Sequence, residues 1–235
     1  MGLFAISDLH LPAHKKPMDI FGPHWEHHFE HIAEDWRARV TPQDIVLLPG
    51  DFSWAMTLEE AADDIAMVGA LPGRKVLLRG NHDYWWNAIG RVRRALPEGM
   101  FAIQNDALIL DEYVFAGSRG WVIPSERAED SDDLRIYNRE RMRLNMSLDT
   151  AERIADGREI VVMMHYPPLT NQLAGFSDIL KQRGIRHCVY GHLHGAALGA
   201  AVRGTVDGVT YHQVSCDGLG FKVYHIDLDG SDAAD

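Results

Sequence analysis

The sequence predicts an α/β fold, and three observations favour it. Short apolar runs that read as buried strands alternate with helical patterns through the first hundred residues, an order typical of βαβ units. Polar motifs rich in Asp, His and Asn follow five of these runs, where each strand would end. The length of 235 residues and the hydrophobic content of 46% suffice for a buried core. We expect one domain over residues 1–235, because no linker or repeat divides the chain.

The first half of the chain shows strands and helices in alternation. The strands that carry the motifs are Leu3–Ile6, Ile45–Leu48, Val76–Leu78, Ile160–Met164 and His187–Tyr190. Helical patterns predict helices over residues 24–40, 57–70 and 84–96. The second helix begins with the capping-box pair Thr57 and Glu60, and the third ends before Pro97.

After residue 100 the pattern changes to shorter segments. Three apolar runs separated by turn-type residues predict a meander, at Phe101–Ile103, Ala107–Leu110 and Val114–Ala116. The Arg-rich stretch from Ser131 to Ala155 predicts a long helix, and a short helix is expected near Asp178–Arg183. The last three expected strands are Ala197–Val202, Val209–Val214 and Phe221–Ile226.

Composition limits the classes of function. The net charge of −11 argues against long nucleic acid as the main partner, because binding of a phosphate backbone requires a basic face. Cys188 and Cys216 form no disulfide framework, and no apolar run reaches the 18 or so residues of a membrane helix. The chain enters its first motif by Asp8, so we expect no signal peptide and a cytoplasmic location. Nothing in the sequence indicates an oligomeric state.

The motifs at the strand ends carry the chemistry. In chain order they are Asp8-Leu9-His10, Gly50-Asp51, Gly80-Asn81-His82-Asp83, His165 and Gly191-His192-Leu193-His194. Each is common by itself in loops or helix caps, but the five together at successive strand ends can converge on one point. Carboxylate, amide and imidazole donors suit a pair of divalent cations, and such a pair suits hydrolysis of a phosphate ester.

This ordered set resembles the calcineurin-like metallophosphoesterase superfamily, in particular its predicted bacterial phosphohydrolases. The resemblance implies a four-layer αββα sandwich, an α/β (α+β) fold of two mixed sheets flanked by helices. It implies that one metal is held by Asp8, His10, Asp51 and His194. It implies that a second metal is held by Asp51, Asn81, His165 and His192, with Asp51 bridging the two. With nitrogen and oxygen donors and no thiolate, we expect Mn, with Fe, Zn or Ni as alternatives.

The resemblance also implies catalytic roles for two residues that are not metal ligands. His82 protonates or stabilises the leaving oxygen while a hydroxide that bridges the metals attacks phosphorus, and Asp83 orients the imidazole of His82. An N-cap of the helix that begins near Tyr84 is the alternative role of Asp83.

Other residues near the motifs leave two interpretations open. Arg119, which lies between glycines after a strand, is a candidate for substrate binding together with Asn81, or an ordinary loop arginine. The aromatic residues after the second and third motifs either stack on a substrate or pack in the core; they are Trp54, Tyr84, Trp85 and Trp86. The histidine cluster of the first helix is a solvated face or a third metal site; it comprises His24, His27, His28 and His31.

These observations favour a phosphohydrolase that acts on a small phosphate mono- or diester. A nuclease is the first alternative, and the acidic charge counts against it. A scaffold without catalysis is the second alternative. Relatives that serve as scaffolds have lost ligand or acid positions, whereas this chain retains every one, His82 included.

Overall fold

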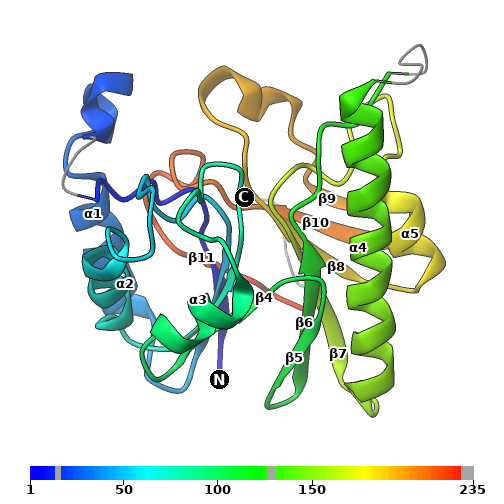
Figure 1. Cartoon of the computed structure of the whole chain (residues 1–235), viewed down its shortest axis with the longest axis horizontal. Coiled ribbons are helices and arrows are strands. Elements are labelled where there is room, and N and C mark those ends of the chain that lie inside the picture. Colours follow the sequence, from blue (N-terminus) through cyan, green and yellow to red (C-terminus); the bar gives the residue numbers. More distant parts are fainter. Residues whose placement is uncertain (14–16, 126–130, 229–235) are drawn as a thin grey trace.

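Two β-sheets packed face to face form the centre of the computed structural model, and helices cover both outer faces (Figure 1). The structure describes residues 1–13, 17–125 and 131–228. In Figure 1, α1 and α2 lie on one side of the sheets, and α4 and α5 lie on the other. The expected four-layer αββα sandwich of two mixed sheets is therefore confirmed.

The first sheet has the strand order β11-β1-β2-β3-β4. Its strands are β1 (Leu3–Ala5), β2 (Ile45–Pro49), β3 (Arg74–Leu78), β4 (Met100–Ile103) and β11 (Tyr224–His225). Strands β1 to β4 are parallel, and β11 pairs with β1 antiparallel. Because side chains alternate along a strand, Leu3 and Ala5 face the second sheet, whereas Phe4 faces the helices. Burial on both faces explains why these strands are almost uninterrupted apolar runs.

The second sheet has the strand order β5-β6-β7-β8-β10-β9. Its strands are β5 (Ala107–Leu110), β6 (Tyr113–Ser118), β7 (Glu159–Met164), β8 (His187–Tyr190), β9 (Gly204–Val206) and β10 (Val209–Gln213). The four central strands are parallel, and the edge strands β5 and β9 are antiparallel to their neighbours.

The predicted meander is wrong in one respect. Strand β4 pairs with β3 in the first sheet, whereas β5 and β6 form a hairpin in the second. The turn at residues 104–106 therefore carries the chain from one sheet to the other, and Asp106 accepts a hydrogen bond from the main-chain N–H of Gln104 there (2.9 Å). Turn residues alone do not show whether the next strand continues the same sheet.

Five α-helices and three 3₁₀ helices are present in the described parts of the chain. The α-helices are α1 (His28–Arg39), α2 (Ala62–Gly69), α3 (Ile89–Ala95), α4 (Asp132–Ala155) and α5 (Ser177–Gln182). The 3₁₀ helices are η1 (Met18–Phe21), η2 (Pro23–Trp25) and η3 (Gly195–Ala200). The long helix α4 agrees with the prediction, and Ser131 caps it by accepting a hydrogen bond from the N–H of Leu134 (3.1 Å).

The first three helices begin later than expected. Residues 23–25 form a 3₁₀ turn, and His27 has left-handed φ, so α1 starts at His28. The Thr57 hydroxyl accepts a hydrogen bond from the Glu60 N–H (3.2 Å), yet this pair closes a turn and α2 starts at Ala62. Residues 84–88 form a loop, so the third helix begins at Ile89.

The end of the chain contains a further correction. The expected strand over residues 197–202 is wrong, because Gly195–Ala200 forms a 3₁₀ helix. Strand β9 at Gly204–Val206, which the sequence did not predict, pairs with β10 instead. No helix in the described parts of the chain is both long and apolar enough to cross a bilayer.

Candidate metal centre

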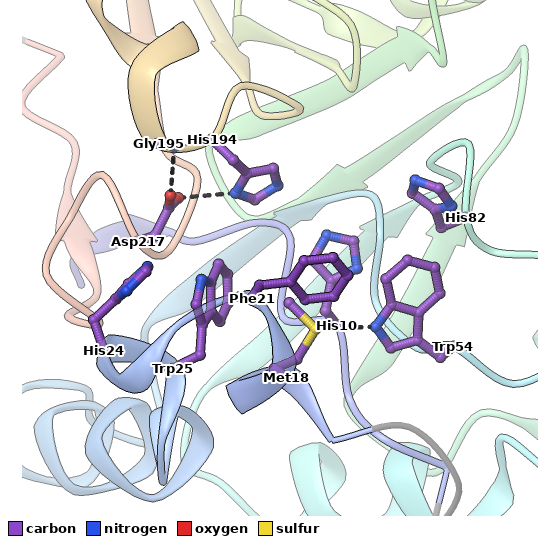
Figure 2. A pocket seen from close by; sticks show the side chains of 10 residues that line it. All are labelled: His10, Met18, Phe21, His24, Trp25, Trp54, His82, His194, Gly195 and Asp217. Atoms are coloured by element: carbon purple, nitrogen blue, oxygen red, sulfur yellow. Dashed lines mark hydrogen bonds and ion pairs between the residues drawn. The ribbon is translucent and has the colours of Figure 1, made fainter.

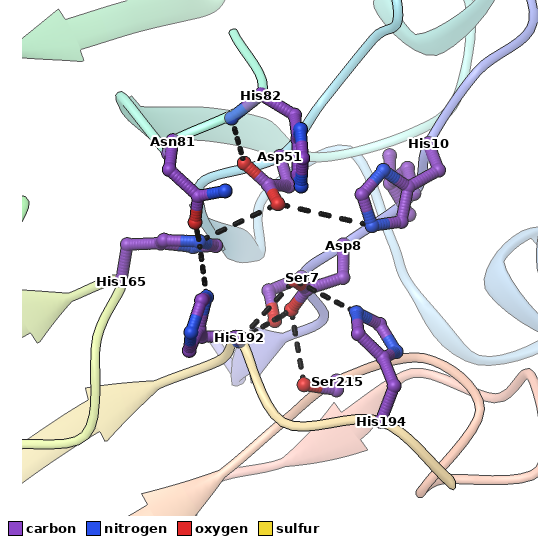
Figure 3. Close-up of polar contacts among 12 residues, drawn as sticks. Ser7, Asp8, His10, Asp51, Asn81, His82, His165, His192, His194 and Ser215 are labelled. Atoms are coloured by element: carbon purple, nitrogen blue, oxygen red, sulfur yellow. Dashed lines mark hydrogen bonds and ion pairs between the residues drawn. The ribbon is translucent and has the colours of Figure 1, made fainter. Parts of the chain in front are cut away.

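The residues of the five motifs lie at the carboxyl ends of parallel strands from both sheets (Figure 3). Asp8 follows β1, Asp51 follows β2, and Asn81 follows β3 of the first sheet. His165 and His192 follow β7 and β8 of the second sheet. Because parallel strands end at one edge of a sheet, the two sheets present these side chains to a shared site.

Main-chain hydrogen bonds hold the loops of the site together. The N–H of Asp8 donates to the Gly50 carbonyl (3.0 Å), which joins the loops after β1 and β2. The N–H of Ser7 donates to the Val214 carbonyl (2.8 Å), and Ser7 and Ser215 form a parallel bridge. The first and second sheets are thus connected directly at the edge where the site lies.

Four residues of the motifs have left-handed backbone conformations. The φ angles are 59° at Asp8, 44° at His10, 52° at Asp51 and 73° at His192. This conformation costs a residue other than glycine about 1–2 kcal/mol. Strain concentrated on four adjacent polar residues indicates a functional site, because the fold maintains it against that cost.

Two glycines of the motifs leave room for the carboxylates. A Cβ at Gly80 would lie 2.1 Å from Oδ1 of Asp51. A Cβ at Gly191 would lie 2.3 Å from Oδ2 of Asp8. Both contacts are too short for any side chain, so these positions require glycine for the acids to occupy the site.

The first group of possible metal ligands comprises Asp8, His10 and His194, whose donor atoms lie within 4.8 Å of one another. Nε2 of His194 lies 3.2 Å from Oδ1 of Asp8. Nδ1 of His194 lies 2.9 Å from Oδ1 of Asp217, a hydrogen bond that leaves Nε2 to face the site. A carboxylate behind the imidazole of a ligand is a common support of metal sites.

A second group lies around His165. Its Nε2 is 2.8 Å from Oδ1 of Asn81, 3.2 Å from Nδ1 of His192 and 3.5 Å from Oδ2 of Asp51. Its Nδ1 donates to the carbonyl of Pro49 (3.0 Å), so Nε2 is the nitrogen available for a ligand. Asp8 also lies within 4.8 Å of Asp51 and His165 by its donor atoms, so both carboxylates stand between the two groups.

Charges of neighbouring residues shift the pKa values of the acids and histidines in the centre. Burial opposes ionisation of Asp51, but the charge and hydrogen bond of His165 lower the pKa of Asp51 to about 2. For the imidazole of His165, burial is outweighed by the charge and hydrogen bond of Asp51, which raise its pKa to about 9. Burial and then the neighbouring His165 lower the pKa of His192 to about 4. A positive charge is therefore favoured on His165, beside Asp51, and disfavoured on His192.

The donor set fits divalent cations. Nε2 of His165 and Nδ1 of His192 face each other across 3.2 Å, and at most one proton can lie between two such nitrogens. Buried carboxylates of Asp8 and Asp51 lie beside them. A cation between these atoms would satisfy both nitrogens and both acids, with displacement of the protons that these groups otherwise bind.

Asp83 holds the loops of the site together. Its carboxylate accepts hydrogen bonds from the main-chain N–H groups of Asp51 (2.9 Å), Phe52 (2.8 Å), Ser53 (3.3 Å) and Gly80 (2.7 Å) and from the Trp85 indole (3.0 Å). A carboxylate offers about four lone-pair positions, which these five donors saturate. Asp83 therefore positions the loops after β2 and β3, and its orientation of the His82 imidazole stays a prediction. It is also not a helix N-cap, because α3 begins at Ile89.

His82 lies at the border of the centre. Its main-chain N–H donates to Oδ1 of Asp51 (2.8 Å), which ties the residue to the possible bridging ligand. Its ring centroid is 5.8 Å from that of His10 and 4.6 Å from that of Trp54. The imidazole thus lies beside the first group of ligands, at the wall of a neighbouring cavity.

Arg119 supports the centre through its main chain. Its carbonyl accepts hydrogen bonds from the N–H groups of His165 (3.2 Å) and Tyr166 (2.9 Å). Its guanidinium lies 3.7 Å from Glu140 and stacks on Trp121 at 4.7 Å from the ring centroid. Binding of a substrate phosphate by Arg119 stays a prediction.

The histidine cluster divides into separate environments. His28 is buried, and its ring nitrogens contact the carbonyls of Trp25 (3.2 Å) and Leu9 (2.8 Å), so it supports the loop that carries His10. His27 and His31 are exposed, whereas His24 lines the cavity beside the centre. The sequence interpretation of one solvated face is thus wrong for His28, whose contacts are structural.

The aromatic residues after the motifs also divide. Trp85 and Trp86 are fully buried, which confirms for these two residues the alternative of packing in the core. Tyr84 is exposed, and Trp54 lines the cavity with its ring stacked on that of His10 (4.8 Å between centroids).

Sequence reasoning missed three polar residues that support the acids and histidines. The hydroxyls of Ser7 and Ser215 donate to Oδ2 of Asp8, and Asp217 holds His194. Ser7 directly precedes a motif, which is a weak signal. Ser215 and Asp217 belong to no motif, and only the adjacency of β10 to β8 brings them to the site.

Comparison with known proteins identifies the class. The family model described as calcineurin-like phosphoesterase matches residues 1–196. The chain belongs to this family, and it is a metal-dependent phosphoester hydrolase. No curated protein matches the sequence.

Solved structures share the fold at low sequence identity. Phosphopantetheinyl hydrolase (PptH) from Mycobacterium tuberculosis has a TM-score of 0.60 and 16% identity, over 100% of this chain and 98% of that one. The protein of unknown function AQ665 from Aquifex aeolicus has a TM-score of 0.52 and 14% identity, with 95% of each chain covered.

Proposed function

We propose that the protein hydrolyses a small phosphate mono- or diester with two divalent metal ions, Mn²⁺ being the first candidate. The observation that carries the proposal is the convergence of two donor groups, around His194 and around His165, with Asp8 and Asp51 between them. A pair of divalent ions, when bound there, supplies charge neutralisation for the phosphoryl oxygens and lowers the pKa of a bridging water.

We assign the ligands as the family resemblance implies: Asp8, His10, Asp51 and His194 would hold one metal, and Asp51, Asn81, His165 and His192 would hold the second. The donor group of Asp8, His10 and His194 supports the first set, and the contacts of His165 with Asn81 and His192 support the second. Asp51 is the bridging residue in this assignment, supported by its distances of 3.8 Å to His10 and 3.5 Å to His165. The separate pairs His194–Asp217 and His165–Pro49 fix the imidazole rings.

The remaining residues act on the substrate and on the loops. His82 donates a proton to the leaving oxygen, for which its place beside His10 is suitable. Asp83 keeps the loops that carry Asp51 and Asn81 in contact. Asn81 contributes a neutral oxygen, so the site keeps positive charge for an anionic substrate.

The test compares mono- and bis-nitrophenyl phosphate with Mn²⁺-loaded and chelator-treated protein. We expect turnover only with metal, with two metal ions per chain by elemental analysis. Asp51→Asn removes the possible bridge and should abolish bound metal and turnover together. The matched control is Asp156→Asn, because Asp156 is 95% exposed and precedes β7, whereas His165 follows the other end of that strand. Two metals bound without turnover of either ester would contradict the proposal and favour the scaffold alternative.

The relative rates on the two esters refine the proposal. Faster turnover of the bis ester would assign a phosphodiesterase, and faster turnover of the mono ester a phosphomonoesterase. The name of the phosphopantetheinyl hydrolase neighbour makes a small organic ester a reasonable choice for the next substrates. The nuclease alternative predicts cleavage of single- or double-stranded DNA at a comparable rate.

A further inference from the structure

A cavity of about 340 Å³ opens beside the first group of metal ligands. It is lined by residues from η1 and η2, from the loops after β1, β2 and β3, and from the segments after β8 and β10 (Figure 2). The lining residues include His10, His82 and His194, so the cavity adjoins both the proposed acid and the proposed first metal. A substrate whose phosphate reaches these ligands can extend into it.

The remaining walls of the cavity are mainly apolar and aromatic. Met18, Phe21, Trp25 and Trp54 line it, and Figure 2 shows their side chains around the same space as His10. The Trp54 indole donates to Sδ of Met18 (3.1 Å), which connects η1 to the loop after β2. Phe21 is 54% exposed, and an apolar group in the cavity would cover it.

Two further polar residues, His24 and Asp217, line the cavity, and the carboxylate of Asp217 is already paired. Oδ1 of Asp217 bonds to Nδ1 of His194 (2.9 Å), and its Oδ2 accepts from the N–H of Gly195 (2.9 Å). None of the described lining residues is Lys or Arg. The walls thus favour an apolar group over a second phosphate or a carboxylate.

The position of the His82 ring on the cavity wall indicates which part of the substrate occupies the cavity. Its ring lies 4.6 Å from that of Trp54, on the cavity wall. A general acid must lie beside the oxygen that it protonates, which is the oxygen of the departing alcohol. We infer that this cavity binds an apolar aliphatic or aromatic body on the leaving alcohol. The inference rests on the proposed function, whose substrate class it narrows.

Hydrolysis of the ester uses water as the nucleophile and His82 as the acid. The oxygen of water forms a bond to phosphorus, and the bond from phosphorus to the alcohol oxygen breaks with its electron pair on that oxygen. The alkoxide takes a proton from the imidazolium of His82 and leaves as a neutral alcohol through the apolar cavity. One proton of the water passes to solvent, and solvent returns a proton to His82 after the alcohol and the phosphate have left.

The first test measures kcat/KM for n-alkyl phosphates from ethyl to hexyl, whose alcohols have similar pKa values. Full burial of a methylene favours binding by about fourfold. With the four additional methylenes partly buried, we expect hexyl phosphate to react about 10- to 100-fold better than ethyl phosphate. Equal kcat/KM across the series would overturn the inference.

Variants at Phe21 test whether this cavity causes the preference for longer alkyl chains. Phe21→Ala should lower the ratio of hexyl to ethyl kcat/KM at least threefold, and Phe21→Leu should restore most of it. The matched control is Met142→Ala on α4, an apolar residue that is 68% exposed outside the cavity lining. An unchanged ratio in Phe21→Ala would overturn the assignment of this cavity.

A binding measurement separates this inference from the proposed function. Ethyl- and hexylphosphonate cannot lose an alcohol, so calorimetry on Mn²⁺-loaded protein reports binding alone. We expect at least tenfold tighter binding of hexylphosphonate, with a negative heat-capacity change. If no ester is hydrolysed but hexylphosphonate still binds more tightly than ethylphosphonate, the proposed function alone is overturned. Hydrolysis without any preference in rates or in binding would overturn the inference only.

Discussion

Asp217 and His194 form a hydrogen bond of 2.9 Å, although Asp217 lies outside every motif. Burial disfavours the charged form of this imidazole, but Asp217 and Asp8 outweigh it and raise the pKa of His194 to about 10. Asp217 thereby keeps Nδ1 of His194 protonated and Nε2 directed at Asp8. The carboxylate acts on the centre through the imidazole.

Asp217→Asn should weaken binding of the first metal, because the amide supports the imidazole less well and turns an N–H₂ donor toward the Gly195 N–H. Loss of such a support costs about 10- to 100-fold in metal affinity. Titration of chelator-treated protein with Mn²⁺ measures it. The control is Asp207→Asn, since Asp207 pairs with exposed Lys181. Equal Mn²⁺ affinity in the two variants would contradict the role of Asp217.

His82→Ala should separate substrates by leaving group. Nitrophenolate leaves without a proton, so nitrophenyl esters should keep most of their rate. Alkyl esters need a protonated oxygen, and their kcat should fall by about 10²- to 10⁴-fold. Steady-state rates on both ester classes measure the effect. Equal losses on both would show that His82 is not the acid.

Asp83→Asn should destabilise the loops after β2 and β3. The amide presents two N–H donors where the carboxylate accepts main-chain N–H groups, so at least one hydrogen bond is lost in a buried place. We expect the free energy of unfolding to fall by about 2–3 kcal/mol, since Asp83 is fully buried. Urea denaturation of the metal-free protein measures it, with exposed Asp156→Asn as the control. A change below about 0.5 kcal/mol would contradict the structural role.

Burial of Lys75 should make the free energy of unfolding depend on pH. The side chain on β3 is buried and donates to the Gly69 and Leu71 carbonyls, and burial lowers its pKa from 10.5 to about 8. Between these values the unfolded chain binds more protons than the folded chain, so stability rises with pH in this window.

Comparison with Lys75→Met isolates this contribution. The free energy of unfolding of the parent chain relative to the variant should increase by about 2 kcal/mol from pH 7.5 to pH 10. Chemical denaturation at both pH values measures it. Lys181→Met, at an exposed lysine, should show no such change. A difference that falls with pH would contradict the predicted sign.

Local patterns predicted much of the fold and the inventory of the site. The strands before each motif are apolar runs whose two faces are both buried, and the same register places the polar motif residues just beyond each strand. Gly80 and Gly191 open the third and fifth motifs because a side chain at either position would collide with Asp51 or Asp8. The chemistry of the donors was therefore available from residue identity and order.

Contacts between distant segments decided the rest. Whether β4 and β5 share a sheet depends on the strands already assembled around them, which a turn sequence does not encode. The saturation of Asp83 by five donors depends on the approach of the loop after β2, about 30 residues away. The apolar cavity arises the same way, since its lining residues come from both ends of the chain. Asp217 meets His194 because β10, which precedes Asp217, pairs with β8, which precedes His194. Residue types and their spacing thus determined which side chains are reactive. Long-range packing determined which residues support those side chains and which part of a substrate the neighbouring cavity can bind.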